Sequence, residues 1–374
     1  MNDSSWFHTN PKKALCVTVL VLFIACDLLT GVFFISVPEG ESHAYYHHTL
    51  KRNYRGKPLW GGKPYPLYTN SLGFKDSETR NVAVRDTRRR IVVIGDSFTE
   101  GIGYPYQKTF VGLVAAECGP SVDILNAGVK SYSPRLYYLK MKYLLEKTGL
   151  RCNELYVFLD VSDVQDEIVY ESFAPVLPET QRIGLFTRTD SFLNPVSFTY
   201  NRLAGKALRG LYAYLFAGGS GSPSGSGERE AAAGAVDMTA FHQNYYEERP
   251  RWTSDGDVYN AWGRRGLALA ENNMKRLVAL CARNGIRVTI AVYPWPFHIR
   301  NAELHSLQVR FWQAFAHTYS TGFMNYFPDF IDGRDPDRVI GTCFIPGDVH
   351  WSEEGHRIIA DRLYRRISGS WSSF

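Results

Sequence analysis

The alternation of apolar runs with helical patterns from Arg90 onward is the feature that most restricts the fold of this chain. Four short runs are continuously apolar and rich in β-branched residues, which predicts buried strands: "RIVVIGD", "VDILNAG", "ELYVFLDV" and "IRVTIAVYP". Helical patterns separate them, and two of these end at Gly149 and Gly285. Buried strands joined by helices predict an α/β fold, a three-layer α/β/α sandwich around a mainly parallel sheet.

The C-terminal part of the chain continues this rhythm. We expect a helix in "LHSLQVRFWQAFAHTY", a strand in "VIGTCFI" and a closing helix in "SEEGHRIIADRLYRRIS". The globular domain is therefore predicted at 90–370, with an insertion at about 164–260. The Gly/Ser-rich stretch 217–235 within the insertion predicts a flexible loop. Aromatic segments beside it predict core packing or amphipathic helices that cover a cleft or touch a membrane or partner.

An apolar run from Ala14 to Ile35 is interrupted by one charge, Asp27. A helix of this length rises about 33 Å, which matches the roughly 30 Å hydrocarbon core of a bilayer. We expect a transmembrane signal anchor at 14–36 after a short N-terminus at 1–13. A cleaved signal peptide is the alternative, although the run is longer than a usual one and no cleavage pattern follows it.

The charges beside this run predict its orientation. Lys12 and Lys13 precede it and two glutamates follow, which favours a cytoplasmic N-terminus and an extracytoplasmic, periplasmic domain on a bacterial inner membrane. Asp27 would be costly against lipid, so we expect it to face a partner helix or a locally hydrated spot.

The segment 37–89 is rich in Tyr, Pro, Gly and basic residues, and it predicts an extended arm that packs on the domain. We expect the basic residues at 88–90 to form a solvated face. The net charge of +5 is only mildly basic, so it suits an acidic glycan or an anionic membrane and is no nucleic-acid signature. Cys118 and Cys152 each precede a predicted strand, and they are expected to form a disulfide if those strands are neighbours.

Ser97 follows the first predicted strand, in the turn that leads to a helix. Ligands bind beyond the carboxyl ends of parallel strands, so this hydroxyl is placed to react if a base activates it. Asp348 stands two residues before His350 in "GDVHW", close enough to orient the imidazole. His356 is expected to be structural, on the last helix. The histidines at 43, 47 and 48 are expected in irregular chain.

These stretches resemble a known family. "VVIGDSFTEG" and "GDVHW" resemble the first and last blocks of the SGNH (GDSL-type) hydrolases, which implies a flavodoxin-like sandwich and a triad of Ser97, His350 and Asp348. "LNAGVKSYSP" resembles the second block, which implies that the N–H groups of Gly128 and Ser97 form an oxyanion hole. "LDVSDVQDE" stands where the third block, GxND, belongs, with Ser162 in place of the asparagine. The resemblance therefore implies that the shorter Ser162 side chain, or a group from elsewhere in the chain, supplies the third oxyanion donor. Removing one hydrogen-bond donor from an oxyanion hole lowers the reaction rate by about 10²–10³-fold.

Four further residues are candidates for supporting roles. Asp163 is either part of the site or a structural acid, and Asn126 is expected to hold its turn rather than to touch substrate. The other two adjoin the triad: Asp96 and Trp351.

The order Asp-x-His-Trp in the last block resembles the SGNH-like O-acetyltransferases of exported polysaccharides such as alginate. "YTNSLGFKD" resembles a segment of membrane-anchored SGNH-like proteins associated with cell-surface glycans. We therefore expect a serine esterase that acts on O-acyl esters, especially O-acetyl esters, of extracytoplasmic carbohydrate. A polysaccharide O-acetyltransferase with the same triad, and a non-catalytic scaffold subunit of a polysaccharide complex, are the alternatives.

The chemistry expected here needs no metal or organic cofactor. The expected partners are an acylated carbohydrate or polysaccharide, the membrane through 14–36 and a membrane protein that exports acyl groups.

Overall fold

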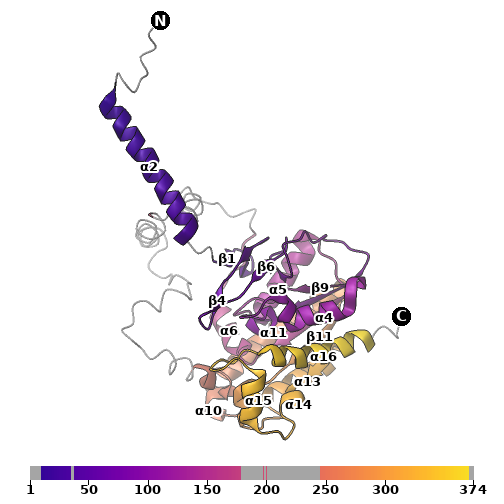
Figure 1. Ribbon diagram of the computed structural model, residues 1–374. Coiled ribbons are helices and arrows are strands. Elements are labelled where there is room, and N and C mark those ends of the chain that lie inside the picture. The colour runs from indigo at the N-terminus through magenta and orange to yellow at the C-terminus, as the bar shows by residue number, and fades with distance from the viewer. Residues whose placement is uncertain (1–9, 35–37, 178–196, 198, 200–244, 370–374) are drawn as a thin grey trace. The chain divides into compact units, whose positions relative to one another are not determined.

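A computed structural model describes residues 10–34, 38–177, 197, 199 and 245–369 (Figure 1). The chain forms two compact units, one made of Met1–Pro38 and Thr180–Gly234, the other of Glu39–Glu179 and Ala235–Phe374. The predicted loop at 217–235 and the aromatic segments beside it lie outside the described residues.

Among its described residues, the first unit contains one helix, α2 (Pro11–Phe34), that is long and apolar enough to cross a membrane. Large apolar side chains such as Leu20 and Phe23 are exposed along it. Asp27 accepts hydrogen bonds from the hydroxyl of Ser197 and the backbone N–H of Thr199, both at 2.6 Å. Ser197 and Thr199 belong to the same unit as α2.

The second unit is built on an eight-stranded sheet in the order β12-β11-β10-β8-β9-β7-β6-β3. Five strands are parallel, which confirms the prediction of an α/β fold with a mainly parallel sheet. They are β8 (Arg89–Ile94), β9 (Val122–Asn126), β10 (Glu154–Leu159), β11 (Arg287–Val292) and β12 (Gly322–Asn325). The side chains of β8, β9, β10 and β11 are almost entirely buried, whereas those of β12 are mostly half-buried. Each fully buried Val, Leu or Ile contributes about 1.5–3 kcal/mol.

The arm extends this sheet on one side with three short antiparallel strands. These are β3 (Arg55–Gly56), β6 (Leu67–Thr69) and β7 (Lys75–Asp76), of which β7 pairs with β9 at Lys75 and Asn126. The arm also forms two hairpins, β1 (Gly40–His43) with β2 (His47–Leu50), and β4 (Leu59–Trp60) with β5 (Lys63–Pro64). The expectation of irregular chain around His43, His47 and His48 is therefore wrong.

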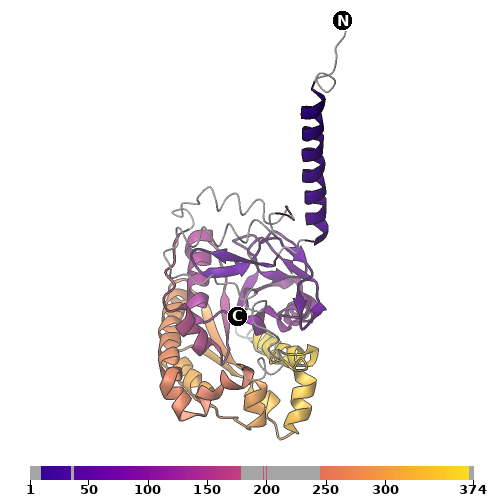
Figure 2. The same cartoon turned by 90° about the vertical axis from the view of Figure 1, so that its left-hand side faces the viewer.

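Helices cover both faces of the sheet (Figure 2). On one face α11 (Arg264–Arg283) packs against α5 (Pro134–Tyr143) and α6 (Asp163–Tyr170), and α13 (Leu307–Thr318) packs on β11 and β12. On the other, α16 (Glu353–Gly369) packs against α4 (Phe110–Cys118). The strand order explains this division, because right-handed crossovers that run in opposite directions along a sheet place their helices on opposite faces.

Short elements complete the described part of this unit. The helices are α3 (Ser97–Glu100), α10 (Gly256–Val258), α12 (Pro296–Arg300), α14 (Phe327–Phe330) and α15 (Pro336–Cys343). Single 3₁₀ or π turns lie at Tyr106–Lys108, Gly119–Ser121, Leu144–Thr148, Arg251–Thr253 and Tyr259–Gly263.

The strand predicted in "VIGTCFI" is wrong, because most of it belongs to α15. Pro336 begins this helix, and the carboxylate of Asp335 caps it by accepting from the N–H of Asp337 at 3.1 Å. Val339 and Cys343 are both buried, four residues apart on one helix face. The buried residues therefore follow a helical spacing. The apolar run was too short for periodicity to distinguish a helix from a strand.

The predicted Cys118–Cys152 disulfide is also wrong, since all six cysteines are free thiols. The strands that follow these two residues are β9 and β10, and β8 lies between them in the sheet. The basic triplet at 88–90 is only partly a solvated face. Arg90 is 1% exposed, and its guanidinium Nε donates to Asp123 at 2.7 Å.

Candidate active site

Ser97 is the first residue of α3, directly after the turn that ends β8. The Asp96 carboxylate caps this helix by accepting from the N–H of Phe98 at 3.0 Å. Gly95 permits the tight turn, because a Cβ there would lie 2.1 Å from the Thr99 hydroxyl oxygen. The turn therefore presents the Ser97 hydroxyl at the carboxyl end of a buried strand, where ligands bind in open parallel sheets.

His350 and Asp348 lie in the loop between α15 and α16, and the structure brings both to Ser97. The His350 Nε2 atom is 2.8 Å from Ser97 Oγ, and its Nδ1 atom is 2.6 Å from Asp348 Oδ1. Since a carboxylate only accepts, Nδ1 carries the proton and Nε2 is left to accept from the Ser97 hydroxyl. The three side chains thus form one continuous chain of hydrogen bonds.

The Asp348 carboxylate is held in its ionised form. Burial raises its pKa, but the charge of His350 and hydrogen bonds from His350 and Trp60 outweigh that effect and lower the pKa to about 2. Its Oδ1 atom also accepts from the backbone N–H groups of Val349 and His350, at 2.6 and 3.1 Å. A negative charge therefore stands behind the imidazole at every pH near neutrality.

Trp351 anchors the loop that carries these residues. It is 1% exposed, and its ring contacts Phe98 and Tyr293 with centroids 4.9 and 4.7 Å apart. It also forms a β-bridge with Phe344, and the His350 carbonyl accepts from the N–H of Ile345 at 2.8 Å. The tryptophan therefore fixes the position of His350 through packing.

Gly128 does not have the free N–H that the resemblance implied. Its N–H donates to the Asn126 side-chain oxygen at 3.0 Å, and a Cβ on Gly128 would lie 2.5 Å from the backbone nitrogen of Glu100. Asn126 in turn donates from Nδ2 to the Thr99 carbonyl at 2.8 Å. Both residues clamp the loop after β9 onto α3, which is the turn-holding role expected of Asn126.

The backbone N–H groups of Ser97 and Ser131 have no hydrogen-bond partner among the described residues. The loop before Ser131 lies along the turn after β8, because Val129 N–H donates to the Gly95 carbonyl at 3.2 Å and Lys130 N–H to the Glu100 carboxylate at 2.9 Å. Ser131 is exposed and has a φ of 59°, a conformation that non-glycine residues adopt uncommonly. Nothing in the sequence around Ser131 predicted that its N–H lies near the candidate active site.

Ser162 lies at the N-cap position of α6, at the carboxyl end of β10. Its N–H donates to Asp160 Oδ1 at 2.7 Å, and its carbonyl accepts from Arg249 at 3.3 Å. In the described part of the chain, no hydrogen bond joins Ser162 to Ser97 or His350. Arg249 also pairs with Asp166 at 2.5 Å, so it holds the third-block loop in place. Sequence reasoning missed Arg249, which lies at the far end of the predicted insertion.

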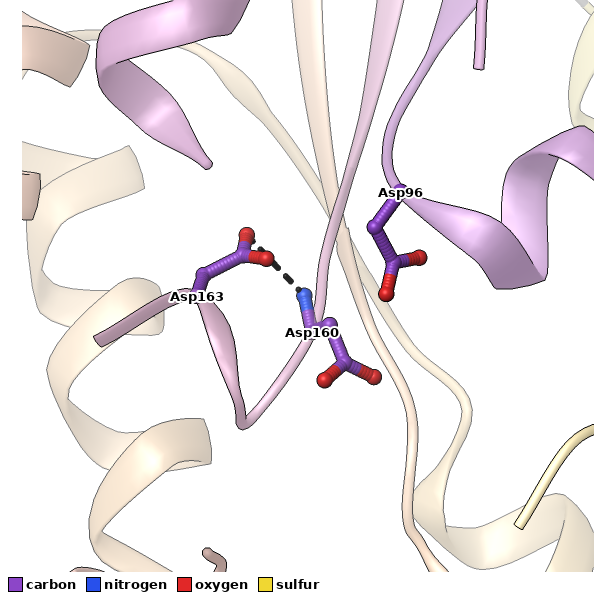
Figure 3. Close-up of side chains that lie close together, drawn as sticks. All are labelled: Asp96, Asp160 and Asp163. Atoms are coloured by element: carbon purple, nitrogen blue, oxygen red, sulfur yellow. Dashed lines mark hydrogen bonds between the residues drawn. The ribbon is translucent and has the colours of Figure 1, made fainter. Parts of the chain in front are cut away.

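Asp96, Asp160 and Asp163 form a buried cluster of carboxyl groups (Figure 3). Asp96 Oδ2 lies 3.4 Å from the Ser97 hydroxyl oxygen. One oxygen from each lies within 4.8 Å of the others. Burial and the charge of Asp160 raise the pKa of Asp96 well above its usual range, and burial with the charge of Asp96 does the same for Asp163. Asp96 and Asp163 therefore oppose each other's ionisation in this buried cluster.

Aromatic donors already occupy this cluster. Tyr293 donates to Asp96 at 3.3 Å, Trp295 to Asp160 at 2.6 Å and Tyr137 to Asp163 at 2.9 Å. Carboxylate oxygens are the ligands that hard cations prefer, but such ions take six or more of them. The three donors therefore already use carboxylate oxygens that a cation would need.

Comparisons with known proteins add little to this geometry. No protein-family profile and no curated protein matches the chain. Among solved structures, similar ones include a member of the lipolytic protein G-D-S-L family from Veillonella parvula DSM 2008 (13% identity, TM-score 0.36, covering 74% of this chain and 96% of that one). Two others have 12% identity and a TM-score of 0.37. They are the psychrotrophic esterase EstA from Pseudoalteromonas sp., covering 76% and 100%, and the lipase/acylhydrolase from Enterococcus faecalis, covering 75% and 96%.

Scores this low carry no argument about family or activity. The functional argument therefore rests on the site itself.

Proposed function

We propose that this chain is a serine esterase of the SGNH type that cleaves O-acyl esters through an acyl-enzyme on Ser97. One observation carries the proposal, the unbroken hydrogen-bond chain from Ser97 through His350 to Asp348 at the carboxyl end of the parallel sheet. A nucleophile, a base and a group that orients the base are what acyl transfer by serine requires. The order of the GDS and Asp-x-His stretches supports the same assignment.

In the first half of the reaction, Ser97 Oγ attacks the acyl carbonyl carbon while His350 Nε2 takes the hydroxyl proton. The bond between the acyl carbon and the leaving alcohol oxygen then breaks, and His350 returns the proton to that oxygen. The charge of Asp348 stabilises the imidazolium between these steps. We assign the developing oxyanion to the N–H groups of Ser97 and Ser131, with the Ser162 hydroxyl as a third candidate donor.

In the second half, an acceptor hydroxyl attacks the acyl carbon of the acyl-enzyme while His350 removes its proton. The bond between the acyl carbon and Ser97 Oγ then breaks, and His350 returns the proton to Oγ. Water as the acceptor gives an esterase, and a sugar hydroxyl gives an O-acetyltransferase. The transferase is the second candidate because Asp348, His350 and Trp351 form the Asp-x-His-Trp order of the polysaccharide acetyltransferases. The helix α2 supports a membrane-anchored enzyme that acts on extracytoplasmic carbohydrate, supplied by an acyl-exporting membrane protein in the transferase case.

The test uses the full chain in detergent with p-nitrophenyl acetate, with and without a glycan acceptor, beside Ser97→Ala. We expect release of nitrophenol, and a Ser97 peptide that is one acetyl group heavier by mass spectrometry after brief incubation. If folded protein shows neither in a Ser97-dependent way, both enzyme functions are refuted and the scaffold alternative is favoured. Hydrolysis without transfer at high acceptor concentration favours the esterase.

A further inference from the structure

Trp60, at the end of β4 in the arm, reaches the carboxylate at the far end of the candidate triad. Its indole Nε1–H donates to Asp348 Oδ2 at 2.8 Å. Its ring also stands edge-on to the His350 imidazole, with centroids 5.1 Å apart and an interplanar angle of 88°. A residue from the segment between the membrane helix and the first parallel strand thus contacts two members of the triad.

The two oxygens of Asp348 are held from opposite sides. Oδ1 accepts three hydrogen bonds from its own loop, namely from Val349 N–H, His350 N–H and His350 Nδ1. In the part of the chain that the structure describes, Oδ2 has one partner, Trp60. The loop alone therefore fixes one oxygen, and the tryptophan fixes the rotation of the carboxylate about its Cβ–Cγ bond.

The surroundings of Trp60 hold the indole in this position. It packs against a small cluster of Tyr65, Leu67 and Ile102. Gly103 leaves room for the ring, because its φ of 85° suits glycine and a Cβ there would lie 3.1 Å from Trp60 Cδ1. Lys75, also from the arm, secures the loop beneath by donating from Nζ to the carbonyls at 101 and 104, at 2.7 and 2.5 Å.

We propose that Trp60 is a positioning residue of the catalytic triad, which it completes by holding Asp348 in line with His350. This inference rests on the proposed function. In this proposal the arm contributes a residue that the triad needs. A chain without the arm would keep Ser97 and His350, but Asp348 would orient His350 poorly. A purely structural tryptophan would stabilise the hairpin without affecting the state of His350.

The test compares Trp60→Phe with two control variants in the full chain. Phenylalanine keeps an aromatic ring and removes the N–H donor. Trp262→Phe makes the same change at another partly buried tryptophan, whose indole N–H has no described partner, and Leu59→Ala perturbs the same hairpin at a side chain that is 67% exposed. With p-nitrophenyl acetate we expect kcat to fall about ten- to a hundredfold in Trp60→Phe with KM within about twofold, because hydrogen bonds to charged groups are the strong ones.

A second readout does not depend on activity. The low-field ¹H NMR signal of the His350 Nδ1–H, assigned by selective histidine labelling, reports its short hydrogen bond to Asp348. We expect this signal in the wild type and in both controls, and its loss or broadening in Trp60→Phe. An unchanged signal and kcat in Trp60→Phe would overturn the proposal, as would an equal loss of kcat in Leu59→Ala.

The NMR readout also separates this proposal from the proposed function. If the wild type shows no Ser97-dependent hydrolysis, the proposed function fails. Trp60 is then judged by the NMR signal alone: its loss in Trp60→Phe supports the positioning role, and its persistence overturns it.

Discussion

Replacing Asp348 with asparagine tests the central electrostatic claim about the site. The amide oxygen can take the place of Oδ1 and accept the same N–H groups, so the loop is expected to keep its shape. The amide nitrogen then faces the Trp60 N–H, and that hydrogen bond is lost. The larger effect is the removal of the charge that stabilises His350 when it is protonated in the transition state.

The magnitude follows from the distance between the two groups. Nδ1 and Oδ1 are 2.6 Å apart, which places the centres of charge roughly 4 Å apart, and both side chains are largely buried. At an effective dielectric constant of about 20, two unit charges at that separation interact by about 4 kcal/mol. Because His350 gains the Ser97 proton as the transition state forms, this interaction lowers the barrier. Its loss predicts a fall in kcat of about 10³-fold.

The assay is hydrolysis of p-nitrophenyl acetate by the full chain, with Ser97→Ala as the baseline and Asp361→Asn as a control at an exposed acid. Thermal unfolding of each variant shows whether the fold is intact. A fall of less than about tenfold in a folded Asp348→Asn protein would refute the assignment of Asp348 as the residue that stabilises the imidazolium.

Three further predictions concern stability. Gly128→Ala places a methyl group against the backbone of Thr99 and Glu100, so we expect the free energy of unfolding, measured by thermal denaturation, to fall by about 1–3 kcal/mol. Gly341 has open space around it, so we expect Gly341→Ala to change the free energy of unfolding little. Asp96→Asn is expected to change the unfolding free energy by less than about 1 kcal/mol, because burial and the charge of Asp160 raise the pKa of Asp96 and so disfavour its charged form, and asparagine also caps helices. Burial lowers the pKa of Lys140 to about 7, so the unfolded chain binds one more proton than the folded chain above that pH. Stability is therefore expected to rise by up to about 1.4 kcal/mol per pH unit between pH 7 and 9 from this residue, and Lys140→Met should remove that increment.

The sequence located the three residues that the structure joins into one hydrogen-bond chain. Ser97 could be predicted as a site residue because it directly follows a continuous apolar run. The strand, the turn and the helix around it are each determined by residues that are neighbours in the sequence. Asp348 and His350 were readable as a pair because they are two residues apart. In each case the signal lay in a short stretch of chain.

The residues that were missed act across the fold. Trp60 donates a hydrogen bond to Asp348, and Arg249 forms an ion pair with Asp166. No local sequence pattern predicts either contact. Gly128 was assigned to the oxyanion hole from its place in a motif, but its N–H is used by Asn126, a hydrogen bond that depends on how the loop folds back on itself.

The sequence by itself determined four of the five parallel strands, the long helices between them and the order of the candidate triad, because apolar periodicity and turn residues act over a few positions. The short strand β12 was not predicted. Only the tertiary structure decided that β8 separates β9 from β10, which leaves Cys118 and Cys152 as free thiols. It alone decided that the arm joins the sheet and supplies Trp60 to Asp348. Strand order and contacts between distant segments are set by packing of the whole chain, which no single stretch encodes.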